Sequence, residues 1–457
     1  MQIQSFKVFQ LHGTANYNID FVDNYLILVA ENGSGKTTLV NIFYYFLSRQ
    51  WKKLNEFKFE KIELKIDDTI YTYEMKWKNI ALREAKIFKR FPGQYQIIAE
   101  KILREYSISE IAEPHEFIDY IMSEYDIPRS IAYEIARMLR NEEISIDSSS
   151  DLKKIDEALN EIFKNIQIVY LPTYRRIEKD LKNIFPELEG NMKEYELRRR
   201  LRSRGDKTPS FIELVEFGME DVKERIQNRC QELRHHFYNN LSRKITGSYL
   251  EDILNKRYKS FDSEKIQIFN REALDYLLNR LDDSIISKSG KEALNGFVEM
   301  VQKKGAISDE DKINAYFVWK LFQIYEEQQK AELDINKFVD ICNDYIGSSK
   351  RFFYDNDNFK VDIQLSDSFS SIEYKDLSSG EKQIVSLFSH LILSKQKYFV
   401  IIDEPELSLS VPWQERFLQD IVNTEDCAGI LAVTHSPFIF RNFLKSYSHS
   451  LEEFKFN

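Results

Sequence analysis

A glycine-rich segment near the start of the chain has the residue types and spacing that bind phosphate. Residues 30–37 have the sequence AENGSGKT, in which Ala30 stands where the first glycine of such a loop is usual. Backbone N–H groups of a loop of this kind surround a β-phosphate, the lysine neutralises phosphate oxygens, and the hydroxyl of Thr37 is placed to bind Mg²⁺. A chance glycine turn before a helix is the alternative. The predicted phosphate-binding residues are Asn32, Gly33, Ser34, Gly35, Lys36, Thr37 and Thr38.

Two carboxylates follow an apolar run near the other end of the chain. Residues 399–402 (FVII) predict a strand buried on both faces, and Asp403 and Glu404 come directly after it. Ligands of open α/β sheets bind at the carboxyl ends of such strands. We expect Asp403 to hold Mg²⁺ through water and Glu404 to polarise the attacking water. Acidic strand ends are common, so this interpretation depends on the phosphate-binding loop.

A third segment, residues 377–383 (LSSGEKQ), predicts the start of a helix. Ser378, Ser379 and Gly380 lie where free N–H groups and the helix dipole favour an anion. An ordinary serine N-cap is the alternative explanation. A fourth segment, residues 433–437 (VTHSP), places His435 after another apolar strand, where a structural histidine is the alternative to a phosphate contact.

These four segments, in this order, resemble the motifs of ATP-binding-cassette (ABC) ATPases, with Ser379 in place of the usual middle glycine of the signature motif. The resemblance implies ATP and Mg²⁺ as cofactors and an ATPase reaction in which Lys36, Glu404 and His435 are catalytic. In that family the signature residues complete the phosphate pocket of the opposite protomer. A homodimer closed around two ATP molecules is therefore implied, and larger homo-oligomers stay open.

The spacing of the motifs narrows the resemblance. Thr37 and Leu377 lie 340 positions apart, and this organisation resembles the RecF, SMC and OLD-like branch, in which a helical insertion splits the head. The predicted fold class is therefore α/β: an ABC ATPase head, with a P-loop core and an antiparallel β arm, split by a large and mostly helical insertion. We find no sustained heptad and expect a compact helical lobe instead of a rod. No glutamine of a Q-loop can be placed, because Gln167 is better explained as a strand residue.

Residues 169–178 and 216–222 resemble segments of stand-alone anti-phage ATPases, namely the AriA component of PARIS and, less closely, the Septu ATPase. This resemblance implies a sensor or scaffold that controls a separately encoded toxic effector, with a Toprim-type nuclease suspected, and a phage-derived trigger. Arg175 and Arg176 are candidate contacts to nucleotide or partner, and a solvated helix start is the alternative. Because 22 residues follow His435, we expect no nuclease activity in this chain.

The elements that must position these residues follow from apolar spacing. Strands are predicted over residues 6–11, 17–21 and 25–29, a helix over 36–48, and a β hairpin or three-stranded arm within 57–77. Helical patterns then dominate, apart from a strand at 166–171 that ends at Pro172. The predicted domains are 1–96 (P-loop and β arm), 97–165 (helical insertion), 166–180 (head strand and Tyr/Arg segment), 181–349 (helical lobe) and 350–457 (signature, Walker B and switch histidine).

Composition excludes several classes of protein. With 64 Lys+Arg against 74 Asp+Glu, the formal net charge of −10 argues against a surface that is basic throughout and binds nucleic acid by charge alone. One basic run, residues 198–204, could contact phosphates or an acidic partner, or could be a solvated helix end. The cysteines Cys230, Cys342 and Cys427 form no CxxC pair, so we expect buried thiols. Without a signal peptide or an apolar run of about 18 residues, a cytoplasmic protein with no membrane partner is expected.

Two other functions stay open from the sequence. A RecF-like or SMC-like DNA-repair clamp would bind DNA through the helical lobe, although the acidic balance speaks against it. The energising subunit of a transporter is disfavoured by the long insertion.

Overall fold

The computed structural model describes residues 1–29, 33–75, 92–93, 95–98, 102, 114–146, 150–172, 210–214, 219–262, 271–304 and 307–456. By its internal contacts the chain forms two units. The first unit consists of Met1–Glu216 with Gln396–Asn457, and the second of Phe217–Lys395. The domain boundaries expected from the sequence stay a prediction.

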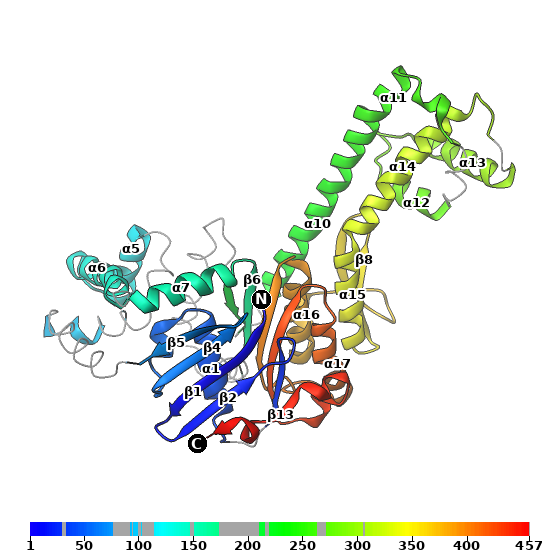
Figure 1. Ribbon diagram of the computed structural model, residues 1–457. Helices are drawn as coiled ribbons and strands as arrows, with labels where there is room; N and C mark the ends of the chain where they lie inside the picture. Colours follow the sequence, from blue (N-terminus) through cyan, green and yellow to red (C-terminus); the bar gives the residue numbers. More distant parts are fainter. Residues whose placement is uncertain are drawn as a thin grey trace. The chain divides into compact units, whose positions relative to one another are not determined.

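A parallel six-stranded sheet forms the centre of the first unit (Figure 1). Its strand order is β13-β3-β12-β11-β6-β7, and all of its pairs are parallel. The strands are β3 (Tyr25–Val29), β6 (Ile166–Leu171), β7 (Phe211–Glu213), β11 (Lys397–Asp403), β12 (Cys427–Thr434) and β13 (Ser448–Ser450). The apolar runs predicted as strands in β3, β6, β11 and β12 are confirmed.

An antiparallel five-stranded sheet, order β14-β2-β1-β4-β5, completes the first unit. Its strands are β1 (Ile3–Leu11), β2 (Ala15–Asp20), β4 (Lys61–Ile66), β5 (Thr69–Glu74) and β14 (Lys455–Phe456). In β4 the sequence KIELKI alternates between half-buried and buried residues, as expected for a strand with one face on the core. The expected arm is thus the β4–β5 hairpin within this sheet.

Helix α1 (Lys36–Leu47) lies between the two sheets of the first unit. The ring of Phe43 packs edge-on against Phe6 of β1, with centroids 4.9 Å apart, and lies 6.1 Å from Phe399 of β11. This apolar contact on both sides fixes the first turn of α1 beside the parallel sheet.

The first unit contains further helices besides α1. They are α2 (Trp51–Leu54), α5 (Pro114–Tyr125), α6 (Arg129–Ile146), α7 (Ser150–Ile162) and α17 (Val411–Val422), with 3₁₀ turns η8 (Pro437–Phe440), η9 (Phe443–Tyr447) and η10 (Leu451–Phe454). Helices α5 and α6 pack on each other around a separate apolar cluster that includes Phe117 and Ile121. In the described part of the chain, no helix combines the length and apolar character that crossing a bilayer requires.

The second unit is mostly helical and contains one three-stranded sheet, order β10-β9-β8. Its helices are α10 (Met219–Leu241), the π-helix η4 (Ser242–Tyr249), α11 (Leu250–Leu254), η5 (Arg257–Ser260), α12 (Arg271–Asn279), α13 (Lys288–Lys304), α14 (Lys312–Ala331), α15 (Leu333–Tyr345), η7 (Tyr374–Asp376) and α16 (Ser379–Leu393). Its strands are β8 (Lys350–Asp355), β9 (Lys360–Leu365) and β10 (Ser371–Ile372). The apolar pattern does not predict β8, whose sequence KRFFYD is charged at both ends.

The sequence predicts a compact helical lobe in this part of the chain. In the structure, this part of the second unit consists mainly of long helices. Helix α10 continues without a break through η4 into α11, and α14 packs against both α10 and η4 (Figure 1, green and yellow-green). Within the described residues, α12 packs against α14, and α13 packs against α12.

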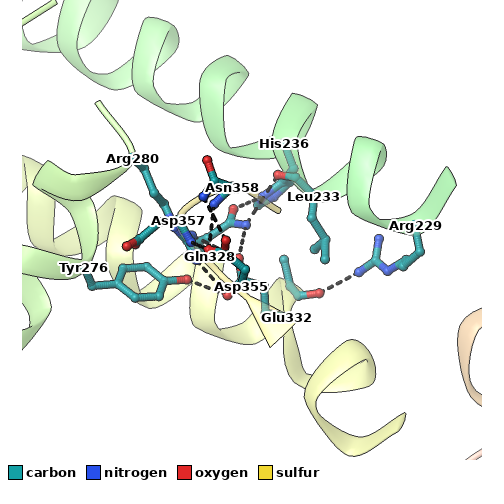
Figure 2. Close-up of polar contacts among 11 residues, drawn as sticks. Arg229, Leu233, His236, Tyr276, Arg280, Gln328, Glu332, Asp355, Asp357 and Asn358 are labelled. Carbon is teal, nitrogen blue, oxygen red and sulfur yellow. Dashed lines mark hydrogen bonds and ion pairs between the residues drawn. The ribbon is translucent and has the colours of Figure 1, made fainter. Parts of the chain in front are cut away.

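A buried ion pair lies where α12, α14 and α15 meet (Figure 2). The guanidinium of Arg280 donates to Glu332 at 2.9 and 3.2 Å, and the two side chains are 0% and 2% exposed. The carboxylate of Glu332 also accepts from the Tyr276 hydroxyl at 2.6 Å and from the Gln328 amide at 2.7 Å. The Arg280 guanidinium stacks 3.7 Å from the Tyr276 ring centroid. The two buried charges are therefore paired, and the Glu332 carboxylate accepts two further hydrogen bonds.

We predict that Arg280→Ala lowers the free energy of unfolding by about 3–5 kcal/mol, because the Glu332 carboxylate would stay buried without its cation. Chemical denaturation of the full chain measures the change. Lys375→Ala is the matched control, since Lys375 and its partner Glu373 are both exposed and their ion pair is screened by water. An Arg280→Ala protein as stable as the Lys375→Ala protein would contradict the prediction.

Candidate functional site

Three neighbouring strands of the parallel sheet end at one edge, and this edge positions the candidate site. In the order β3-β12-β11, Val29 pairs with Thr434 and Val433 pairs with Asp403. The segments that follow β3, β12 and β11 therefore start side by side. Parallel pairing thus brings together motifs that lie about 400 positions apart in the sequence.

The glycine-rich turn leads from β3 into α1. Gly33 and Gly35 have φ of 80° and 85°, in the left-handed region that glycine adopts without a Cβ penalty. Gly35 is the N-cap of α1 and provides no side-chain cap, so the N–H groups of the first turn are left for another acceptor. The Ser34 hydroxyl is buried and has no hydrogen-bond partner within the described residues. These features fit a phosphate group; Asn32 and Ala30 lie outside the described residues.

Lys36 places a buried cation at this edge. Its side chain is 5% exposed, and its Nζ contacts the imidazole of His435, 3.4 Å from Nδ1 and closer to Nε2. An ammonium group only donates, so the ring nitrogen that faces it accepts. Burial lowers the pKa of Lys36, and the carboxylates of Glu404, Asp403 and Glu406 oppose that shift. The cation is thus held by negative charge in a site with little water.

Thr37 and Asp403 present oxygen atoms that suit a magnesium ion. The Thr37 hydroxyl donates to Asp403 Oδ2 at 2.8 Å, and the Asp403 side chain is buried. Within the described residues, this edge included, no three His, Cys, Asp or Glu side chains gather as a metal site. Magnesium commonly takes one or two protein oxygens and completes its shell with phosphate and water. Thr37 and Asp403 therefore fit Mg²⁺ bound together with a nucleotide.

Glu404 is held in an unusual backbone conformation. Its φ is 53°, a region that non-glycine residues seldom adopt, and its N–H donates to the Val433 carbonyl at 2.8 Å. Its Oε1 lies 3.7 Å from His435 Nε2. Burial raises the pKa of Glu404, Asp403 and Glu406 raise it further, and His435 and Lys36 oppose the shift. A carboxylate with a raised pKa accepts a proton more readily.

A third carboxylate, Glu406, was not singled out from the sequence. It accepts hydrogen bonds from the His435 backbone N–H and the Thr434 hydroxyl, both at 2.8 Å. Its position two residues after Glu404 is visible in the sequence, but its partners depend on the pairing of β11 with β12.

The segment 377–383 lies in the second unit. Ser378 is the N-cap of α16: its hydroxyl accepts from the Glu381 N–H at 3.3 Å, and its own N–H donates to Glu381 at 2.6 Å. The Glu381 carboxylate also accepts from Lys350 at 3.0 Å. Ser378 and Ser379 are exposed, and Gly380 is buried. Ser378 thus has a capping role, while its exposed position leaves it accessible to another molecule.

Other residues singled out from the sequence have varied positions. Thr38 lies half-buried in the first turn of α1. Gln167 is a buried residue of β6, as expected for a strand residue. The cysteines are free thiols, and Cys230 and Cys342 are buried as expected, whereas Cys427 is half-buried. Arg175, Arg176 and the basic run 198–204 lie outside the described residues. So do residues 173–178 of the first resemblance segment and 216–218 of the second.

The sheet, the loop before α1 and the helical insertion define an α/β ATPase head, and the predicted fold class is confirmed. Residues 1–440 match the family model described as an AAA ATPase domain, and the chain belongs to this family. No curated protein matches the sequence.

Several solved structures are similar to this chain. A Smc head domain with an extended coiled coil from Pyrococcus furiosus, bound to the C-terminal domain of ScpA, is 13% identical, with a TM-score of 0.32 and coverage of 96% of this chain and 90% of that chain. A SmcHead bound to the C-winged helix domain of ScpA is 11% identical, with a TM-score of 0.32 and coverage of 96% and 91%. A Smc head domain with a coiled coil and joint from Pyrococcus yayanosii is 11% identical, with a TM-score of 0.28 and coverage of 96% and 93%.

We predict that Lys36→Ala weakens ATP binding about 10–100-fold, because the loop loses a charge-assisted hydrogen bond to phosphate. Isothermal titration calorimetry with Mg²⁺ and ATP measures the change. Lys164→Ala is the control, since Lys164 is exposed and lies in the same unit. Unchanged affinity in the Lys36→Ala protein would show that the loop does not bind the phosphates.

Proposed function

We propose that this chain hydrolyses ATP and uses the reaction to switch between separate and paired heads. The observation that carries the ATPase assignment is the convergence of Lys36, Glu404 and His435 at one sheet edge, with Thr37 bonded to Asp403 beside them. A buried cation, a carboxylate of raised pKa and an oxygen pair for Mg²⁺ are the groups that phosphoryl transfer to water requires.

Each group has a distinct role in the proposed reaction. Lys36 and the N–H groups of the first α1 turn bind the phosphates. Thr37 and Asp403 hold Mg²⁺, which neutralises charge on the phosphate oxygens. Glu404 orients the attacking water and accepts its proton, and His435 contacts the terminal phosphate. Asn32, Ser34 and Thr38 complete the phosphate contacts in this proposal.

The paired state follows from the exposed start of α16. Ser378 and Ser379 are exposed at this helix N-terminus, where free N–H groups favour an anion, and Gly380 next to them is buried. In the proposed homodimer this surface contacts the γ-phosphate of ATP bound by the partner subunit. ATP then favours the paired heads by the free energy of contacts that exist only in that state.

The biological role is proposed from the resemblance of residues 169–178 and 216–222 to anti-phage ATPases. In this hypothesis the chain is a cytoplasmic sensor or scaffold that holds a separately encoded effector, a Toprim-type nuclease, until a phage-derived trigger arrives. Arg175 and Arg176 would contact nucleotide or partner. The net charge of −10 of the whole chain favours a protein partner over DNA.

We predict that Glu404→Gln binds ATP but hydrolyses it at least about 100-fold more slowly, since the amide cannot accept the proton from water. With Mg²⁺ and ATP this variant should accumulate as a dimer. Mass photometry measures the dimer fraction, and phosphate release measures the rate.

Ser378→Arg in the Glu404→Gln background provides the control for the dimer. A bulky cation at the α16 N-terminus should abolish the ATP-dependent dimer and leave ATP binding by each monomer unchanged, because the loop lies in the other unit. A dimer that forms equally well with Ser378→Arg would contradict the proposed arrangement of paired heads, although the ATPase assignment would stand.

A further prediction tests the proposed partner. Purified protein with Mg²⁺ and ATP should leave DNA and RNA intact, and affinity purification from cells that express the neighbouring genes should recover a nuclease. Lys36→Ala should alter the amount recovered if ATP controls the complex. Nucleic acid cleavage by this chain alone, or stimulation of its ATPase by DNA without any protein partner, would favour the DNA-clamp alternative.

A further inference from the structure

Glu406 connects the segment after β11 to the segment after β12. Its Oε1 accepts from the His435 N–H and its Oε2 accepts from the Thr434 hydroxyl, so both carboxylate oxygens are used. Hydrogen bonds to an ionised carboxylate are stronger than those between neutral groups. The backbone at His435 is therefore hydrogen-bonded directly to the acidic segment that contains Glu404.

The bonds around Glu406 continue into α17. The Ser436 N–H donates to the Thr434 hydroxyl oxygen at 2.9 Å, and the Ser436 hydroxyl donates to Gln414 of α17 at 2.6 Å. Thr434 is fully buried, whereas Glu406 is half-buried. Residues 434–436 thus have little freedom to move while the Glu406 bonds persist.

The hydrogen bonds of Glu406 affect the reacting groups because they hold the backbone from which the His435 side chain extends. His435 lies within 3.7 Å of Glu404 Oε1 and contacts Lys36. The His435 side chain is 30% exposed, so packing by itself is not enough to fix the position of the imidazole. A shift of 1 Å in such groups lowers turnover substantially without removing any of them.

We propose that Glu406 is a positioning residue for ATP hydrolysis: by binding the His435 N–H and the Thr434 hydroxyl, it sets the imidazole of His435 relative to Glu404 and Lys36. This inference rests on the proposed ATPase function. Glu406 itself contacts backbone and hydroxyl donors in the structure, and its hydrogen bonds act on the reaction through His435. Its charge also acts on Glu404, and Glu406→Gln removes that charge while it keeps the hydrogen-bonding groups.

Two substitutions separate positioning from simple folding. Glu406→Ala removes both acceptors. Glu406→Gln keeps an acceptor for the His435 N–H, and its amide group can donate to the Thr434 oxygen if the Thr434 hydroxyl turns toward the Ser436 carbonyl, which lies 3.4 Å away. Glu415→Ala is the matched control, because Glu415 is an exposed carboxylate on the nearby helix α17.

The experiment measures kcat, ATP affinity and Tm for each full-length variant. We expect Glu406→Ala to lose about 10–100-fold in kcat with ATP affinity within about 3-fold of wild type, since the lost bonds act on His435 and not on the loop. Glu406→Gln should recover most of the kcat, and Glu415→Ala should behave as wild type.

A double substitution tests the route through His435. If Glu406 acts by placing His435, then Glu406→Ala combined with His435→Ala should be no slower than His435→Ala alone. Additive losses would overturn the inference, as would Glu406→Gln being as slow as Glu406→Ala. A Glu406→Ala protein that loses ATP affinity and Tm together would show a structural role instead. Absence of ATP hydrolysis in the wild type would overturn the proposed function itself, whereas wild-type turnover in Glu406→Ala would overturn this inference alone.

Discussion

The parallel pairing of β11 with β12, and of β12 with β3, is the constraint on which the candidate site depends. Each strand supplies one segment to the same edge: the glycine turn after β3, the acidic segment after β11 and the His435 segment after β12. Because parallel strands are buried on both faces, a slip in register would expose apolar residues of β11, which are buried along nearly the whole strand. The same burial that stabilises the sheet thus fixes the spacing of the polar groups at its edge.

The electrostatics of that edge follow from how the strands end. Lys36 lies among Asp403, Glu404 and Glu406, and each of these carboxylates acts on its pKa against the effect of burial. The glycine turn leaves the first N–H groups of α1 without a side-chain cap, and Glu404 adopts a left-handed backbone in order to bond β12. The backbone of Glu404 thus carries a local conformational cost at a candidate reacting group, and the buried sheet offsets it.

The second unit is organised by a different kind of interaction. Its long helices meet at the buried Arg280–Glu332 pair, in which the Glu332 carboxylate also accepts hydrogen bonds from Tyr276 and Gln328 (Figure 2). The same unit presents the exposed start of α16, capped by Ser378 and Glu381. A rigid polar core and an accessible helix end in one unit suit a surface that another molecule contacts.

Sequence alone determined the local elements and the residue types of the site. Apolar runs predicted β3, β6, β11 and β12, and the glycine spacing placed Lys36 and Thr37 at a helix start, because these features depend on neighbours within a few residues. The roles of Glu406 and Glu332 could not be found in this way. Glu406 resembles any acidic residue in a turn until the register of β11 and β12 brings it to the His435 N–H, and Glu332 resembles an exposed helix end until Arg280 is packed against it. Both depend on contacts between residues 29 or more positions apart, which only the tertiary structure decides.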